Sequence, residues 1–389
     1  MAKFKSKRLV NFAKNSISQS CEEAGLKDSI SLFPEKTLDS IKKSGLLTVC
    51  IDRKNGGQNI GLVSGTNYLM LKLLKLIGSG NLVAGRILEG HINAQLLIHQ
   101  FGSKRQKARF AKYAFAGKFF GVWNTQAKDG TTLKHNKKGD FILNGSKTFA
   151  TGTGYVSRPI ITASLANGSW QMCIVPLNKI KKNIDSSWWN PMGMKASRSF
   201  KISFKNVIIS KHDLLGIPND YYSQPQFGGG AVRFAAVQLG GAEMLLKETI
   251  EYLKTLNRTD DPYQKMRLGE MTIAITSGNQ WIEGAAKRMD EHMQYDSVEN
   301  SEIFLTYTNM MRTAIEEICT KVIVLCQKCV GARGLNKPYH FERIIRDLNT
   351  YLRQPAPDTS LADIGRFALK SEIELDRLWD HKENNNENI

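Results

Sequence analysis

Apolar positions in the first third of the chain recur every three or four residues. The stretch TNYLMLKLLKLIG, residues 66–78, is one example, and AGRILEGHINAQLLIHQFG, residues 84–102, is another. This spacing places apolar side chains on one face of a helix, and glycines separate the segments. The pattern predicts a helical region over about residues 28–118.

Near residue 120 the spacing changes to the alternation expected of strands. In SFKISFKNVIIS, Phe200 and Ile202 alternate with lysine and serine, as in a half-buried strand. In DFILNGSKTFAT, Asn144 and Gly145 stand between two apolar runs, which favours a hairpin turn there. The strand-like pattern continues to about residue 215.

The helical spacing returns after QPQFGGGAVR, where one apolar face is formed by Leu239, Ala242, Leu246, Ile250 and Leu253. The order predicts a mainly α protein with a central β-domain. Its parts are an N-terminal helical domain (1–119), a middle β-domain (120–220) and a C-terminal helical bundle with a polar tail (221–389). The tail WDHKENNNENI is polar and low in complexity, so it is predicted to be frayed.

Length and composition fit a large globular protein. The 389 residues are 41% hydrophobic, the basic start is not followed by an apolar core with a small-residue cleavage site, and no run of about 18 apolar residues occurs. This pattern predicts a soluble cytoplasmic protein without a membrane span. The six cysteines are scattered, as buried free thiols are. Cys326 and Cys329 form a C-x-x-C without a second pair or a suitably spaced histidine, so no metal site is predicted.

The formal net charge of +18 favours an anionic partner, such as nucleic acid, a phosphorylated cofactor, an acyl-CoA or an acidic surface. Charge alone does not choose among these. The basic cluster in GSKRQKARFAKYAFAGK is interleaved with apolar residues at helical spacing, as on the solvated face of an amphipathic helix. No recognised nucleic-acid motif accompanies the charge, so nucleic acid is not expected as a partner.

Three segments resemble motifs of the acyl-CoA dehydrogenase family, in the same order along the chain. The first is GKFFGVWNTQAKDGTT, residues 117–132, which is similar to the family segment Thr-Glu-Pro followed by Gly-Ser-Asp. Gln126 and Ala127 replace the usual Glu-Pro. The resemblance implies FAD as cofactor, held here by Asn124, Thr125, Gly130 and Thr131, because the flavin ring needs directed hydrogen-bond donors.

The second segment, FILNGSKTFATGTG, resembles the family stretch Leu-Asn-Gly-x-Lys-x-Trp-Ile-Thr-Asn. The resemblance implies that Phe149 lies against the flavin and that Thr151 contacts its reactive edge; a hairpin with one buried aromatic residue is the alternative for Phe149. Phenylalanine in place of tryptophan keeps the aromatic face and loses the indole donor. Further on, NPMGMKASRSFKISFKNVIISKHDLLG matches the family pattern that closes the β-domain.

The third segment, QKCVGARGLNKPYHFERIIRDL, is similar to the family's Gln-x-x-Gly-Gly-x-Gly-Phe followed by Arg-Asp. In relatives these glycines approach the ADP part of a flavin bound by the neighbouring subunit. The resemblance therefore implies a homodimer or homotetramer in which Gly331 and Gly334 serve this role. Arg258 occupies the place of an arginine on the same cofactor, although Asp260 and Asp261 replace the Phe-Gly that usually follows.

The residues at the two family positions for a catalytic base cannot act as bases. In relatives the helix with Arg-Asp leads into a loop carrying a glutamate that removes the substrate α-proton, and that place is Pro355 within RDLNTYLRQPAPDTS. The other known place is Val232. Asp358 is the nearest ionisable group on the Pro-Ala-Pro elbow and is the candidate base; its alternative role is to cap the next helix.

The resemblance covers nearly the whole chain and implies the family fold: helical domain, β-barrel-like middle domain and helical bundle. Three functions stay open. The first is an FAD-dependent oxidoreductase that oxidises an acyl thioester or other small acyl substrate by hydride transfer to flavin, with an electron-transfer flavoprotein or oxygen as electron acceptor. The second is a flavin-dependent monooxygenase of the same fold, and the third is a catalytically degenerate flavin-binding protein.

Overall fold

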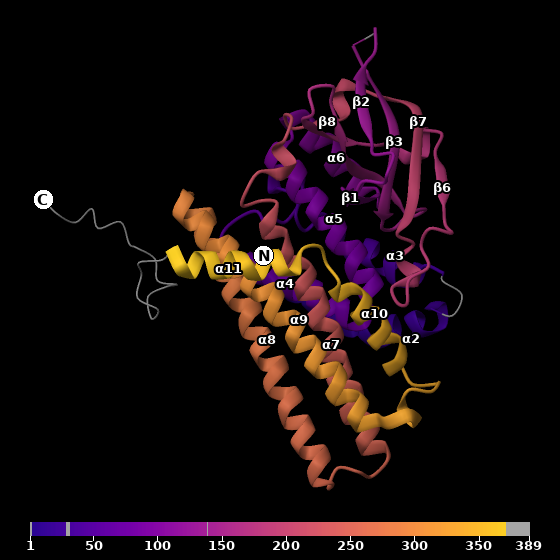
Figure 1. Ribbon diagram of the computed structural model, residues 1–389, viewed down its shortest axis with the longest axis vertical. Coiled ribbons are helices and arrows are strands. Elements are labelled where there is room, and N and C mark those ends of the chain that lie inside the picture. Colours follow the sequence, from indigo (N-terminus) through magenta and orange to yellow (C-terminus); the bar gives the residue numbers. More distant parts are fainter. Residues whose placement is uncertain (1, 29–31, 138, 371–389) are drawn as a thin grey trace, which may run out of the picture.

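The structure is a computed structural model that describes residues 2–28, 32–137 and 139–370. The polar tail predicted to be frayed lies outside these residues. A sheet occupies one end of the molecule, and long helices extend from it to the other end (Figure 1). The predicted fold class, mainly α with a central β-domain, is confirmed.

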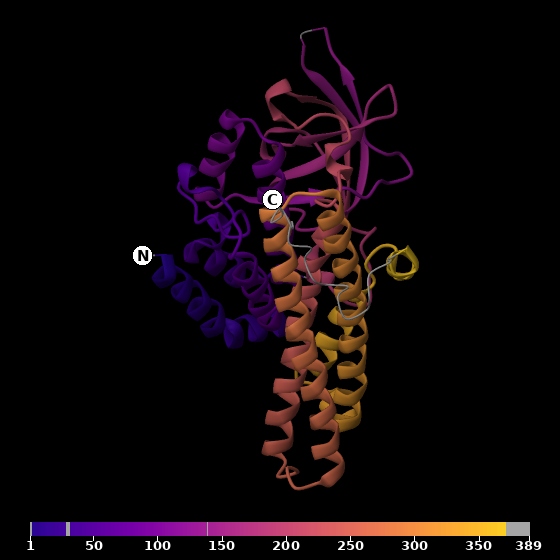
Figure 2. The same ribbon diagram turned by 90° about the vertical axis from the view of Figure 1, so that its left-hand side faces the viewer.

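Helices of the N-terminal part pack beside the long helices, as Figure 2 shows. They are α1 (Ala2–Asn15), α2 (Ile17–Asp28), α3 (Glu35–Ser44), α4 (Asn67–Gly80), α5 (Leu82–Phe101) and α6 (Lys104–Phe115). The basic cluster lies on α6, whose opposite face buries Phe110 and Ala111. The prediction that this cluster forms the solvated face of an amphipathic helix is therefore confirmed.

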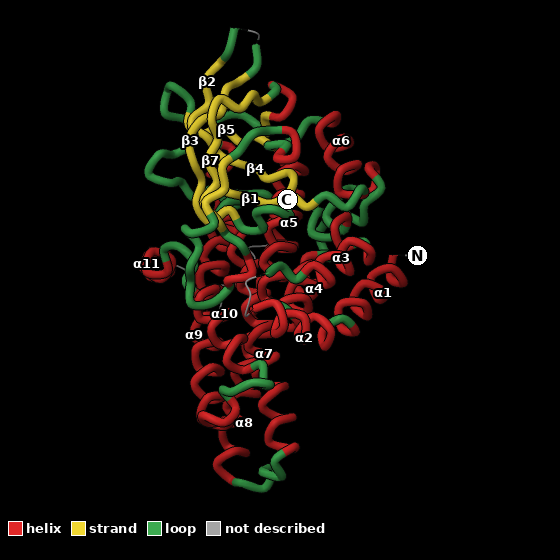
Figure 3. The backbone as a smooth tube through the Cα atoms, turned by 90° about the vertical axis from the view of Figure 1, so that its right-hand side faces the viewer, coloured by secondary structure: helices red, strands yellow, loops and turns green. Residues whose placement is uncertain are grey.

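The central sheet contains eight strands, yellow in Figure 3. They are β1 (Phe119–Trp123), β2 (Thr132–His135), β3 (Phe141–Ala150), β4 (Val156–Ser164), β5 (Trp170–Ile174), β6 (Asn183–Asp185), β7 (Phe200–Ile209) and β8 (Leu214–Leu215). The order is β6-β7-β3-β2-β4-β5-β8, and β1 pairs with β4 in parallel. Ile202 on β7 is fully buried, as the alternation predicts.

The hairpin predicted at Asn144-Gly145 is wrong, because both residues lie inside the continuous strand β3. Between the pairs Leu143–Val207 and Gly145–Phe204, one residue of β3 faces two residues of β7, so the extra residue of this β-bulge lies on β7. The Asn144 side chain accepts a hydrogen bond from the Asn206 N–H at 2.7 Å. Gly145 has φ +99°, and a Cβ there would lie 2.2 Å from the Gly130 carbonyl oxygen, so only glycine fits.

The long helices of the C-terminal part are α7 (Ala231–Thr255), α8 (Pro262–Gln294), α9 (Val298–Gly334), α10 (Phe341–Leu352) and α11 (Pro357–Lys370). Helix α7 packs against α4 so closely that a Cβ on Gly240 would lie 2.1 Å from the Lys75 carbonyl oxygen. This contact fixes the N-terminal helices to the bundle. The break predicted at the two prolines is confirmed, since α10 ends at Leu352 and α11 begins at Pro357.

None of the described helices is long and apolar enough to cross a membrane. Within the same residues, no group of three or more His, Cys, Asp or Glu side chains is placed to hold a metal ion. Cys326 and Cys329 are both buried in α9, and Thr249 donates a hydrogen bond to the Cys326 sulfur at 3.3 Å.

Candidate functional site

The segment between β1 and β2 lies against the last residues of β3. Bridges join Gln126 to Lys147 and Gly130 to Ser146. The Thr148 N–H donates to the Thr125 carbonyl at 3.1 Å. The structure therefore brings together the first two motif segments, which carry six of the proposed flavin-binding residues: Asn124, Thr125, Gly130, Thr131, Phe149 and Thr151.

A buried lysine, which sequence reasoning did not use, organises this junction. Lys147 has no exposed surface, and its ammonium donates to the Asn124 carbonyl at 2.9 Å and to the Thr162 hydroxyl at 3.0 Å. Burial lowers the pKa of Lys147 from 10.5 to about 7. The Asn124 side-chain oxygen accepts from Thr162 and from the Tyr222 hydroxyl, at 2.6 and 3.1 Å, so it acts within the protein's own network.

Thr131 lies deeper in the protein than the family resemblance implies. It is fully buried, and its hydroxyl donates to the Thr162 carbonyl at 2.7 Å. Its N–H donates to the side-chain oxygen of Gln126 at 3.0 Å. Gln126, which replaces the family glutamate, thus holds the turn that contains Gly130 and Thr131.

Phe149 presents an aromatic face to solvent. Its side chain is 49% exposed, although its backbone has φ +51°, a left-handed conformation that costs about 1–3 kcal/mol in a non-glycine residue. Trp188 and Trp189 pack edge-on against it, with ring centroids at 4.9 and 5.8 Å. A strained, exposed aromatic ring braced by two others is a suitable platform for a planar ligand. The hairpin alternative for Phe149 does not hold, since the ring is half exposed and β3 is continuous.

The hydroxyl of Thr151 lies beside this platform. It shares a hydrogen bond of 2.9 Å with the Ser199 hydroxyl, which in turn contacts Ser197 at 2.8 Å. The Thr151 carbonyl accepts from the Trp123 indole N–H at 3.0 Å. These bonds fix the end of β3 against β1 and β7.

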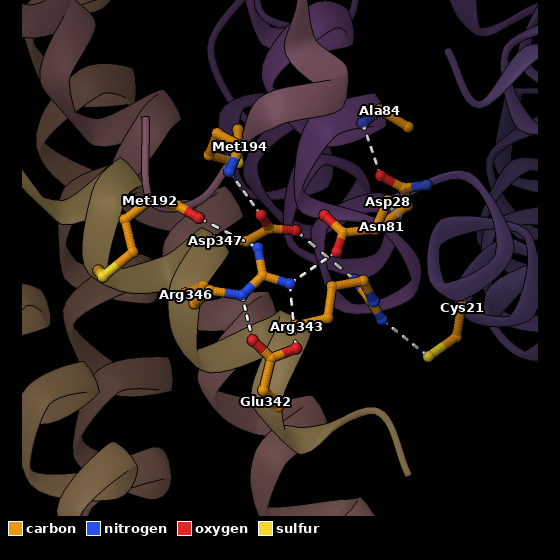
Figure 4. A network of polar contacts seen from close by, with 10 residues as sticks. All are labelled: Cys21, Asp28, Asn81, Ala84, Met192, Met194, Glu342, Arg343, Arg346 and Asp347. Atoms are coloured by element: carbon orange, nitrogen blue, oxygen red, sulfur yellow. Dashed lines mark hydrogen bonds and ion pairs between the residues drawn. The ribbon is translucent and has the colours of Figure 1, made fainter. Parts of the chain in front are cut away.

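The loop that follows the two tryptophans is anchored on α10, as Figure 4 shows. The Met194 N–H donates to Asp347 at 2.5 Å, and Arg346 donates to the Met192 carbonyl at 3.1 Å. Arg346 also pairs with Asp28 of α2 at 2.6 Å. Asp347 is 4% exposed, and burial raises its pKa to about 6 against the opposing effect of the nearby Arg343 guanidinium. The Arg-Asp pair thus holds the aromatic platform in place.

A cavity of about 360 Å³ opens next to this junction. Val122 of β1 lines it, two residues before Asn124, and Tyr221 lines it, one residue before the Tyr222 that bonds Asn124. Side chains of α5, α8 and α9, of the segment before α7 and of the first turn of α7 form the other walls. Most are apolar, among them Leu96, Leu97, Phe227, Met289 and Phe304, whereas Asn93, His99, Arg233 and His292 are polar.

Neither family position for the base points a usable group into this cavity. Val232 is fully buried, and the exposed Pro355 offers its carbonyl to Arg312 at 2.9 Å. Asp358 is exposed in the first turn of α11 and does not line the cavity. A carboxylate in that turn stabilises a helix by its interaction with the dipole, which agrees with the helix-terminal role. Asp358 as a catalytic base stays a prediction without geometric support.

The proposed adenine-side residues lie at the other end of the molecule. Arg258 follows the end of α7 and pairs with Asp261 at 3.2 Å, and Gly331 interrupts the end of α9 with φ +58°. Gly334 is the last residue of α9. This end of the bundle is far from the sheet in Figure 1. One chain therefore does not bring Arg258, Gly331 and Gly334 to the same ligand as Phe149 and Thr151.

Comparisons with known proteins agree with this architecture. The family described as "Acyl-CoA dehydrogenase, C-terminal domain" matches residues 232–353. Dibenzothiophene monooxygenase of Rhodococcus qingshengii is 23% identical over 375 residues, covering 87% of each chain. An acyl-CoA dehydrogenase of Bacillus subtilis (strain 168) is 22% identical over 360 residues, covering 88% of this chain and 90% of the relative.

Solved structures with the same fold include members of both types. FMN-bound TdsC from Paenibacillus sp. A11-2, a dibenzothiophene monooxygenase, superposes with a TM-score of 0.83 at 20% identity, over 94% of this chain and 97% of that one. Butyryl-CoA dehydrogenase from Megasphaera elsdenii gives a TM-score of 0.81 at 19% identity, over 95% and 98%.

Proposed function

We propose that this chain, which belongs to the acyl-CoA dehydrogenase family, is a flavin-dependent monooxygenase that oxidises a small, largely apolar molecule in the cavity beside α5 and α7. The observation that carries the proposal is the state of the two base positions. A dehydrogenase of this family needs a carboxylate to remove an α-proton, and neither Val232 nor Pro355 supplies one. Oxygen transfer from a reduced flavin needs no such base. The similarity to dibenzothiophene monooxygenases over 87% of the chain points the same way.

The flavin would bind at the junction of β1, β3 and the 188–199 loop. Phe149 offers a face 49% exposed, and the Thr151 hydroxyl lies beside it, so the residues present fit a planar heterocycle that needs directed hydrogen bonds. The flavin would supply the electrons that divide O₂ into an oxygen atom for the substrate and water. The chain's own residues would orient the ring and exclude water: Lys147 holds the Asn124 carbonyl, and Trp188 supports Phe149.

FAD stays the proposed cofactor, with its adenine end on Arg258, Gly331 and Gly334 of a neighbouring subunit. Within one chain, these residues lie at the end of the helical bundle that is far from Phe149 and Thr151. This separation supports an arrangement in which two subunits share the cofactor, and that arrangement requires at least a homodimer. Relatives also include an FMN-bound protein. If the flavin released from the purified protein is FMN, these three residues need not contact a cofactor.

The test is to load the protein with FAD or FMN and compare two reactions by rapid-mixing absorbance. Butyryl-CoA added without oxygen should not bleach the oxidised flavin. The reduced protein mixed with oxygen and indole, a compound bound by TdsC, should reoxidise its flavin and yield an oxygenated product. Anaerobic bleaching by the thioester would instead support the acyl-CoA dehydrogenase function, with an electron-transfer flavoprotein or oxygen as acceptor.

If bleaching occurs, Asp358→Asn separates the two roles of that residue. Loss of bleaching in the variant with retained flavin would identify Asp358 as the base. Retained bleaching would agree with a helix-terminal role, because loss of one carboxylate charge in the first turn of a helix costs about 1 kcal/mol or less. A protein that takes up neither flavin would contradict both enzymatic functions.

A further inference from the structure

One guanidinium in the cavity lacks a full set of partners. Arg233 is 8% exposed and lines the cavity from the first turn of α7. Its Nε donates to the side-chain oxygen of Asn93 on α5. Its two terminal nitrogens make no hydrogen bond with any of the residues that the structure describes. The terminal N–H groups of a guanidinium are strong donors, and these face a cavity in which a ligand can accept their hydrogen bonds.

The charges around Arg233 do not balance. Glu89 of α5 is 2% exposed, and its carboxylate is already bound by Arg86 and by the Asn93 amide. The single carboxylate of Glu89 therefore faces two positive charges, that of Arg86, which it binds, and that of Arg233. The nearby Cys50 and Tyr221 add no negative charge, because burial raises the pKa of Cys50 to about 12 and raises that of Tyr221 as well. One positive charge is left over at this end of the cavity.

The helix itself adds to the positive field. Gly229 and Gly230 line the cavity next to Arg233, and α7 begins at Ala231. The N-terminus of a helix carries a partial positive charge that favours a nearby anion. With 25 residues, α7 is long enough for this effect to be fully developed. The macrodipole and Arg233 thus favour the same sign of ligand charge.

The remaining ionisable groups of the cavity lie elsewhere. Asp296 lines the cavity and is exposed, and its charge acts on His292. Burial lowers the pKa of His292, whose ring stacks on Phe304 with an interplanar angle of 15°. His99 lines another part of the cavity and faces Asp52 at 4.0 Å. The carboxylate whose charge acts on Arg233 is that of Glu89.

We propose that the substrate of this cavity is a one- or two-ring aromatic molecule carrying a single anionic oxygen, a carboxylate or a phenolate, which binds the terminal nitrogens of Arg233. The volume of about 360 Å³ and the walls of leucine, methionine and phenylalanine suit the ring system. A guanidinium binds a carboxylate or phenolate by charge-assisted hydrogen bonds, and the low polarity of the surroundings strengthens them. The proposal deepens the proposed function and depends on that cavity being the substrate site.

A coloured probe tests the proposal without turnover. We would titrate the purified protein with 4-nitrophenol, whose absorbance reports its ionisation, and with 4-nitroanisole, which has the same ring and no acidic proton. Bound 4-nitrophenol should be in its anionic form at a pH where the free compound is largely neutral. Because a hydrogen bond to a charged group contributes about 1.5–3 kcal/mol, the anion should bind about 10- to 100-fold more tightly than 4-nitroanisole.

Three variants locate the effect. Arg233→Met should abolish the preference for the anion and the shift in its ionisation, and Arg233→Lys should keep part of both, since it keeps the charge and loses the planar fork. Arg366→Gln removes one positive charge from exposed α11 and should leave both unchanged. Equal binding of the two probes by the unaltered protein would overturn the proposal even if the Arg233 variants fail to fold. So would an anion preference that survives in Arg233→Met.

The outcome is separable from the flavin test. A protein that binds flavin and prefers 4-nitroanisole would contradict the anion site and leave the monooxygenase proposal standing. A protein that binds 4-nitrophenolate through Arg233 but takes up no flavin would contradict the proposed function and keep the anion site.

Discussion

Replacing Lys147 by methionine should make the protein more stable at neutral pH and less stable at alkaline pH. Lys147 has no exposed surface, and burial lowers its pKa from 10.5 to about 7. A lysine with a lowered pKa in the folded state carries a penalty that is complete below pH 7 and is relieved as the pH rises toward 10.5. One unit of pKa corresponds to about 1.4 kcal/mol, so the penalty below pH 7 is about 5 kcal/mol.

Methionine removes that charge and also removes two hydrogen bonds. The Asn124 carbonyl loses its donor, which costs about 1–3 kcal/mol in a buried site, whereas the Thr162 hydroxyl keeps its hydrogen bond to the Asn124 side chain. At pH 7 the variant Lys147→Met should therefore be more stable by about 2–4 kcal/mol. Between pH 7.5 and pH 9.5 this advantage should shrink by about 3 kcal/mol, because the folded lysine is then neutral and its penalty falls.

The assay is urea unfolding of the flavin-free proteins at pH 7.5, 8.5 and 9.5, followed by tryptophan fluorescence. The control is Lys205→Met, which exchanges an exposed lysine of β7 and so subtracts the general effect of the substitution. The quantity compared is the difference in unfolding free energy between each variant and the parent at each pH. A difference for Lys147→Met that stays constant over the three pH values would refute the reasoning, since it would mean that the buried lysine does not lose its proton.

Three further predictions follow from the same region. Burial raises the pKa of Asp347, so the parent protein should lose about 3 kcal/mol of stability as the pH rises from 4 to above 6 and the buried carboxyl ionises. Asp347→Asn should abolish this loss, as measured by unfolding at pH 4, 5, 6 and 7. Gly145→Ala should lower the unfolding free energy by about 2 kcal/mol or more, because the new Cβ would clash with the Gly130 carbonyl. Gly168 also has positive φ, but a Cβ there meets nothing within 4 Å, so the control Gly168→Ala should cost only about 1 kcal/mol. Thr151→Ala should weaken flavin binding about fivefold, corresponding to one lost hydrogen bond of about 1 kcal/mol, as measured by quenching of flavin fluorescence.

Helices and the sheet region were predictable because their patterns are local. Leu239, Ala242 and Leu253 are buried on α7 as their spacing predicts, and Leu246 is half-buried on the same helix. A helix presents the same face every three or four residues whatever it packs against, so the pattern survives without knowledge of the partner. The same holds for the end of α10, where two prolines forbid continuation of the helix.

The Asn144-Gly145 turn was predicted wrongly because the deciding contacts are not local. An Asn-Gly pair supplies the positive φ that a hairpin turn needs, and Gly145 uses the same property inside β3, opposite the bulge in β7. The Gly130 carbonyl, in a segment that precedes β2, occupies the space beside Gly145. Asn206 on β7 donates to Asn144. No property of the dipeptide itself distinguishes these two environments.

The candidate site was predictable only where a motif carried it. Phe149 and Thr151 were identified by resemblance to a family stretch, but the tryptophans that support the ring come some forty residues later and carry no spacing signal. Lys147 lies within the same stretch, and its role depends on the Thr162 hydroxyl of a different strand. The cavity lies between α5, α7, α8 and α9, so its charge is a property of the packed helices. The sequence around Arg233 gives no sign that the nearby carboxylate, Glu89, is already bound by Arg86 and Asn93.

The charge of the cavity bears on which reaction it can support. A general base must have a pKa near the working pH to accept a proton effectively. An unpaired guanidinium within a few ångströms would lower the pKa of a carboxylate by about 1–3 units and weaken it as a base. A carboxylate at Val232 would lie one residue from Arg233, and its negative charge would also compete with an anionic substrate for that cation. The same unpaired cation that disfavours α-proton abstraction in this cavity therefore favours an anionic aromatic substrate. Oxygen transfer from a flavin needs no carboxylate base, so it is compatible with the cation and with an anionic substrate.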